Sequence, residues 1–266
     1  METGRTITGE EKIIKNNDID GASPLVVTGK TSSIENMLDR SRCALTVCDT
    51  CVEANASKTE LALQGLNNVM KLVGDDNYYA IRTSHSKVLI TGGNNRCSLT
   101  GTANKIKVRA DYFAAMLRDS SVKLETTEYS NVSAYIPGSL MKTIATRSRI
   151  CLSNGHMDLY GNNNQIVVKD FGTANINGFG NMIVNTDEGK IGSKTKLSLT
   201  RPRDFQPNII INLHLESSAS GSEGDSILLT GLDKKGNKIM KVIKIDGKKY
   251  KEDTPYCIKK GKVVKA

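Results

Sequence analysis

Strand-sized runs recur at a short, regular spacing in the middle of the chain, and this spacing limits the fold more than any other feature. From Tyr78 to about residue 200, alternating runs such as Lys87–Thr91, Lys105–Arg109 and Gln165–Val168 are separated by Gly, Asn, Asp or Ser. A strand centre arrives every eight or nine residues. Alternation of apolar and polar residues indicates strands with one buried face. The sequence therefore predicts a mainly β protein.

The turns between these runs favour one β architecture over another. In Asn162–Val168 and Asn175–Asn185 each strand offers only two or three inward apolar positions, and the turns consist of Asn and Gly. Such narrow apolar stripes are buried when each coil stacks on the next, and Asn tolerates the left-handed backbone of tight turns. We expect a β-solenoid-like stack of short strands, with an irregular β-sandwich as the alternative. A composition with 23 Gly and no Trp also suits frequent turns.

The N-terminal part carries a different pattern, and residues 1–77 are expected to form a mixed cap region with one helix near residues 58–73. Ser57-Lys58-Thr59-Glu60 fits a capping box, in which a hydroxyl and a carboxylate satisfy free backbone donors at a helix start. Gly74 stands where a left-handed cap would end the helix. Apolar residues recur at helical spacing between these two signals: Leu63, Leu66, Met70 and Val73.

Three further segments complete the expected domain organisation. Residues 78–216 form the repetitive β body. Residues 217–226 have the Ser- and Gly-rich composition of a linker. Residues 227–266 are expected to form a basic β-meander, with a turn at Lys234–Asn237 and a tight hairpin turn at Asp246-Gly247.

The net charge of +9 is confined to the C-terminus. Residues 234–266 contain 12 Lys and three acids, giving 12 − 3 = +9, so the remaining residues are neutral overall. Six lysines are candidates for contact with a polyanion or another partner: Lys234, Lys235, Lys248, Lys249, Lys259 and Lys260. Alternatively, lysines protect exposed strand edges from unwanted pairing. Arg is missing from this tail, which disfavours sequence-specific base recognition, although contact with an anionic surface or nucleic-acid phosphates is compatible with it.

Two groups of residues are candidate chemical sites: three closely spaced cysteines and a His–Asp pair. Cys43, Cys48 and Cys51 match the spacing of the first three iron ligands in plant-type ferredoxins. The residues between Cys43 and Cys48 alternate like a strand, however, so free thiols are favoured over a cluster or zinc site. His156 and Asp158 would share one face of a strand and could share a proton. No cofactor, catalytic residue or metal site is assigned.

The chain shows no apolar run long enough to span a bilayer and no signal-peptide pattern at its start. Synthesis in the cytoplasm is therefore expected, with export by a non-classical route left open.

These features favour a non-catalytic structural or interaction protein that self-assembles through stacked β edges into a homo-oligomer or filament. A first alternative is a secreted or virus-encoded effector or surface-binding module, which docks on an anionic partner through its lysine-rich C-terminus. A second alternative is a polysaccharide-acting enzyme on a β-solenoid, which requires acids that converge on one groove.

Overall fold

The computed structural model describes residues 5–8, 14–16, 25–30, 33–36, 40, 42–118, 120–125, 128–170, 172–186, 196–200, 206–215 and 217–266. These residues form β-strands and turns, and no helix occurs among them. Consequently, the described residues contain no helix that could cross a membrane. The chain divides into two compact units, Met1–Val132 and Ser133–Ala266, which are described separately.

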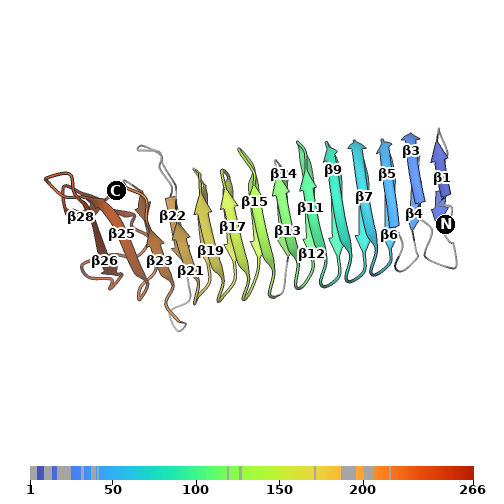
Figure 1. Cartoon of the computed structure of the whole chain (residues 1–266). Coiled ribbons are helices and arrows are strands. Elements are labelled where there is room, and N and C mark those ends of the chain that lie inside the picture. The colour runs from blue at the N-terminus through green and yellow to red at the C-terminus, as the bar shows by residue number, and fades with distance from the viewer. Residues whose placement is uncertain are drawn as a thin grey trace. The chain divides into compact units, whose positions relative to one another are not determined.

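Unit 1 is a β-solenoid of two parallel sheets, in which consecutive strands alternate between the sheets (Figure 1). One sheet has the order β1-β3-β5-β7-β9-β11-β13 and the other β2-β4-β6-β8-β10-β12-β14. The strands are β1 (Arg5–Thr8), β2 (Ile14–Asn16), β3 (Leu25–Lys30), β4 (Ser33–Asn36), β5 (Arg42–Cys48), β6 (Cys51–Asn55), β7 (Glu60–Leu66), β8 (Val69–Val73), β9 (Tyr78–Ser84), β10 (Lys87–Thr91), β11 (Arg96–Thr100), β12 (Asn104–Arg109), β13 (Ala114–Arg118) and β14 (Ser120–Glu125). The predicted β-solenoid is therefore confirmed.

Unit 2 continues the same alternation of parallel strands and ends in antiparallel pairs (Figure 1). The parallel strands are β16 (Leu140–Ile144), β17 (Arg149–Ser153), β18 (His156–Tyr160), β19 (Gln165–Lys169), β20 (Thr173–Asn177), β21 (Met182–Asn185), β22 (Lys196–Thr200), β23 (Ile209–Asn212), β24 (Ser218–Ala219) and β25 (Ser226–Leu232). Strand β26 (Lys238–Lys244) pairs with β25, and β28 (Lys262–Lys265) pairs with β27 (Tyr256–Lys259). Strand β15 (Asn131–Tyr135) lies at the boundary between the units.

Left-handed residues set the repeat in unit 1. Positive φ angles recur every nine residues from Arg40 to Tyr112, at one residue in each corner between consecutive strands. The backbone N–H of each corner bonds to the next coil, as where the Asp49 amide donates to the Leu66 carbonyl at 3.0 Å. Two strands and two corners thus make a coil of 18 residues, which is the register between β10 and β12. The spacing of strand centres in the sequence reflects this half-coil.

The core consists of apolar side chains stacked in register between coils. In unit 1, buried Leu45, Leu63, Ile81, Leu99 and Leu117 occupy one such row. In unit 2, one row consists of isoleucines: Ile150, Ile166, Ile183, Ile210 and Ile227. Full burial of such a side chain stabilises the fold by about 1.5–3 kcal/mol. Each coil therefore depends on its neighbours for stability.

The helix predicted near residues 58–73 is wrong, because this segment forms β7 and β8. The hydroxyl of Ser57, expected to cap a helix, instead accepts the backbone N–H of Asp75 in the next coil at 3.0 Å. Leu66, counted on the apolar helix face, is 50% exposed. The backbone N–H and C=O groups of β7 form hydrogen bonds with strands 18 residues away, in place of the bonds that a helix would form within itself.

The C-terminal segments also differ in detail from the expected pattern. Residues 217–226 include β24 and bury Ala219, Ser220 and Asp225. The turn at Lys234–Asn237 joins β25 to β26 as expected. The expected hairpin turn at Asp246-Gly247 is wrong, because β26 and β27 belong to different sheets. The Asp246 carboxylate instead accepts three successive backbone N–H groups and holds a wider loop.

Candidate interaction surfaces

The C-terminal lysines lie on the terminal strands of unit 2 and on the turns beside them. Strands β26 and β28 each end one sheet, and together they carry Lys238, Lys241, Lys244, Lys262 and Lys265. The six lysines singled out from the sequence are all exposed and lie in three places: Lys234 and Lys235 in the β25–β26 turn, Lys248 and Lys249 in the loop after β26, and Lys259 and Lys260 at the β27–β28 turn. The structure therefore gathers the tail charge at the sheet-ending strands of unit 2.

Asp246, one of the three acids in this tail, and Asp233, which directly precedes it, are engaged with nearby N–H groups rather than with lysines. Asp233 binds both the side chain and the backbone N–H of Asn237, and these bonds lower the pKa of its carboxyl. The backbone N–H of Tyr250 and those of Lys248 and Lys249 lower the pKa of Asp246 in the same way. Both carboxylates shape turns.

The lysine charges of this tail are consequently uncompensated. Within the part of the chain that the structure describes, none of the twelve lysines after residue 233 forms an ion pair. Lys241 Nζ donates to the Gly261 carbonyl at 2.7 Å, and Lys249 Nζ lies 5.1 Å from the centre of the Tyr250 ring. Neither contact neutralises charge, so this end of unit 2 is a positively charged surface.

The outer face of one sheet in unit 2 carries a central apolar row, with polar and charged residues beside it on β17 and β19. Its central row runs across six paired strands: Cys151, Val167, Val184, Ile211, Leu228 and Val242. Val242 is 69% exposed, and Met182 and Ile209 are exposed in the adjacent row. On β26 the outward positions read Lys238, Met240, Val242 and Lys244, so lysines flank the apolar side chains. The exposed apolar side chains thus concentrate on β26, at Met240 and Val242.

The three cysteines with ferredoxin-like spacing do not come together. Cys43 and Cys48 lie at opposite ends of β5, which places their backbones about 16 Å apart at 3.3 Å per residue. Cys43 is buried, whereas Cys51 is exposed on β6. No group of three or more potential metal ligands occurs among the described residues. The alternation between Cys43 and Cys48 reflects the strand.

His156 and Asp158 do share one face, as the sequence indicated. His156 Nε2 lies 3.0 Å from Asp158 Oδ1, and His156 Nδ1 lies 2.6 Å from Thr173 Oγ1 on β20. The Asn175 side-chain amide donates to Asp158 Oδ1 at 3.0 Å. A hydroxyl, an imidazole and a carboxylate are thus linked on a solvent-facing sheet, and the bonds to Thr173 and Asn175 join β18 to β20 of the next coil.

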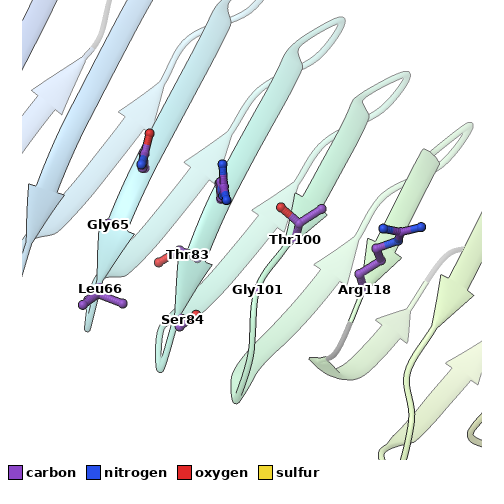
Figure 2. Close-up of a pocket in the computed structure, with 9 residues that line it drawn as sticks. Gly65, Leu66, Thr83, Ser84, Thr100, Gly101 and Arg118 are labelled. Atoms are coloured by element: carbon purple, nitrogen blue, oxygen red, sulfur yellow. The ribbon is translucent and has the colours of Figure 1, made fainter.

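A groove of 660 Å³ crosses the carboxyl ends of β7, β9, β11 and β13 in unit 1 (Figure 2). The described residues that line it supply two guanidinium groups, several hydroxyls and a side-chain amide, and none of these described residues is acidic: Gln64, Gly65, Leu66, Arg82, Thr83, Ser84, Thr100, Gly101 and Arg118. The register places Arg82 beside Thr100, and Figure 2 shows Thr100 and Arg118 on neighbouring strands. The described lining is polar and carries two guanidinium groups.

Glycine is required at two positions of this groove. A Cβ on Gly65 would lie 1.6 Å from the Val47 carbonyl oxygen, and one on Gly101 would lie 1.7 Å from the Thr83 carbonyl oxygen. The same close approach brings Asn68 Nδ2 to the Val47 oxygen at 3.0 Å and Asn104 Nδ2 to the Thr83 oxygen at 2.7 Å.

Comparisons with protein-family models, curated proteins and solved structures found no match for this chain.

A repeated motif that sequence reasoning missed underlies these surfaces. Gly-x-x-Asn occurs at six corners: Gly65–Asn68, Gly74–Asn77, Gly92–Asn95, Gly101–Asn104, Gly161–Asn164 and Gly178–Asn181. The asparagine side chains are buried and accept from a backbone N–H of the preceding coil, as Asn68 Oδ1 does from Thr50. The sequence does contain a signal for this motif: in unit 1 a glycine followed three residues later by an asparagine recurs at intervals of nine or eighteen residues. The Arg82–Thr100–Arg118 row was also missed, because it forms only when strands 18 residues apart are paired.

Proposed function

We propose that this protein is a non-catalytic interaction module that docks on an anionic lipid surface through the lysine-bearing end of unit 2. The observation that supports the proposal is the outward face of β26, where Met240 and Val242 lie between Lys238 and Lys244. The apolar side chains suit the headgroup boundary of a bilayer, and lysine stems extend their ammonium groups to phosphates. Each lysine near such a surface contributes about 1 kcal/mol.

The remaining charges of the tail fit the same partner. The carboxylates of Asp233 and Asp246 are engaged with backbone N–H groups, so the nearby lysines are available to anionic headgroups. A nucleic acid is a poorer match, because the apolar row offers nothing to phosphates. Tyr250 and Tyr256 pack edge to face on each other with ring centres 5.3 Å apart, rather than forming an open stacking platform.

The same lysines bear on self-assembly, the function first expected from the sequence. Two copies that met through β26 or β28 would bring lysines against lysines, and like charges facing each other oppose pairing. The strands that end the sheets of unit 1, β1 and β2, are the place where pairing of copies would be tested. Sedimentation across a range of concentrations measures this directly: growth in size supports pairing, and a constant monomer excludes it.

Vesicle binding tests the lipid proposal. The full chain should co-sediment with vesicles that contain phosphatidylserine and not with pure phosphatidylcholine vesicles, and added salt should release it. Replacing Lys238 and Lys244 with Gln should weaken binding about fivefold per lysine, from about 1 kcal/mol each.

The control replaces Lys87 and Lys105, which are exposed lysines of unit 1, with Gln. This variant keeps the wild-type affinity if the end of unit 2 forms the contact. Equal binding to neutral and anionic vesicles, or an equal loss in the two double variants, would contradict the proposal. The Met240→Ser and Val242→Ser variants separate the apolar contribution from the charge contribution.

A further inference from the structure

The polar groove of unit 1 has the chemistry of a binding site for an oxyanion-bearing ligand. Arg82 and Arg118 are exposed and lie two strands apart on the same face, so their backbones are about 10 Å apart. Thr100 lies on the strand between them, in register with both arginines, and is half buried. Arginine is suited to bidentate binding of carboxylate, sulfate or phosphate groups.

The rest of the lining indicates what such a ligand carries besides its charge. Gln64 offers a side-chain amide, and Ser84 and Thr100 offer hydroxyls. Amides and hydroxyls both donate and accept, which matches the hydroxyl groups of a sugar. None of the described residues that line the groove is aromatic, so they offer the bases of a nucleic acid no surface for stacking.

The shape favours an extended ligand rather than a compact one. The groove crosses four neighbouring strands, β7 to β13, which corresponds to about 14 Å at 4.8 Å per step. Figure 2 shows that the labelled residues lie along the ends of these strands, and Gly65 and Gly101 contribute backbone without side chains. We propose that this groove binds a linear acidic oligosaccharide, with one carboxylate or sulfate group held between Arg82 and Arg118 over Thr100.

Titration of the full chain with end-labelled oligosaccharides, followed by fluorescence anisotropy, tests the proposal. A polygalacturonate oligomer supplies carboxylates, and a heparin-derived oligomer of similar length supplies sulfates as well. At least one should bind, and the stronger of the two identifies the anionic group. A neutral dextran oligomer should not bind.

Single substitutions locate the contact. Arg82→Gln and Arg118→Gln should each weaken binding about tenfold, as expected for loss of a hydrogen bond to a charged group. Thr100→Val keeps the side-chain shape and should weaken binding by a smaller factor. Arg96→Gln is the matched control, because Arg96 is exposed on β11 about 13 Å along the strand from Thr100. Its affinity should remain that of the wild type.

The proposal fails if neither acidic oligomer binds, or if both arginine variants bind as tightly as Arg96→Gln. It also fails if Lys259→Gln and Lys260→Gln abolish binding while the arginine variants do not, because the contact would then lie on unit 2. Oligo(dT) or polyglutamate binding as tightly as the acidic oligosaccharide would likewise overturn it. Circular dichroism of each variant verifies that the solenoid is intact.

Discussion

Asn68 provides the sharpest test of the corner motif. Its side chain is buried; Oδ1 accepts the Thr50 amide at 3.0 Å and Nδ2 donates to the Val47 carbonyl at 3.0 Å. Asn68→Ala removes both bonds and leaves one buried donor and one buried acceptor unpaired. At about 1–3 kcal/mol for each of the two unpaired groups, the free energy of unfolding should fall by about 2–6 kcal/mol.

Two variants calibrate this loss. Asn55→Ala makes the same chemical change at an exposed position of β6 and should shift stability by less than about 0.5 kcal/mol. The stability loss of Asn68→Ser should fall between those of the two alanine variants. In the next coil Ser86 occupies the equivalent position, and its hydroxyl accepts the backbone N–H of Asn68 at 2.9 Å. A serine retains an acceptor for Thr50 but does not reach Val47.

Urea unfolding followed by circular dichroism measures the stability differences, provided that the slopes of the transitions agree between variants. Hydrogen exchange adds a local measurement: the backbone N–H of Thr50 should exchange faster in Asn68→Ala and at the wild-type rate in Asn55→Ala. If Asn68→Ala costs no more than Asn55→Ala, or if Thr50 exchange is unaffected, the asparagine ladder does not stabilise the corners as argued.

Three further predictions follow from individual groups. Gly101→Ala should destabilise the protein by more than about 3 kcal/mol, because the new Cβ would clash with the Thr83 carbonyl. Gly236 also has a positive φ, but a Cβ there would meet nothing within 4 Å, so Gly236→Ala is the control. Equal losses of stability in the two variants, measured by urea unfolding, would refute the clash. Burial raises the pKa of the Cys97 thiol to about 12, so native protein at pH 8 should be alkylated by iodoacetamide at exposed Cys51 and not at Cys97, as read by mass spectrometry. The backbone N–H groups of the 246–250 loop lower the pKa of Asp246, so its carboxylate should stabilise the loop above the ordinary carboxyl pKa and lose this effect as pH falls through the lowered pKa. The NMR chemical shift of the Lys248 backbone N–H should follow this titration and should not titrate in Asp246→Asn.

The helix error shows how a solenoid can mislead a local pattern. Each half-coil in this region supplies two inward residues, such as Leu61 with Leu63 and Met70 with Leu72, separated by an exposed corner. Selecting Leu63, Leu66, Met70 and Val73 from this pattern gives helical spacing by coincidence. Gly74 resembles a helix cap because its φ is positive, but its lack of Cβ serves the close approach to Ala56 of the neighbouring coil.

The sequence by itself determined the local features of this protein. Alternating runs with Asn- and Gly-rich turns every eight or nine residues specify short strands and tight corners, because backbone sterics and side-chain periodicity are local properties. The charge excess after residue 233 was likewise visible without a fold.

Only the tertiary structure decided what depends on stacking between coils. The 18-residue register places Arg82, Thr100 and Arg118 in one groove. Strand pairing also aligns Val184, Ile211 and Val242 into an apolar row. These neighbours are set by hydrogen bonds and packing between coils, which composition and local spacing do not contain.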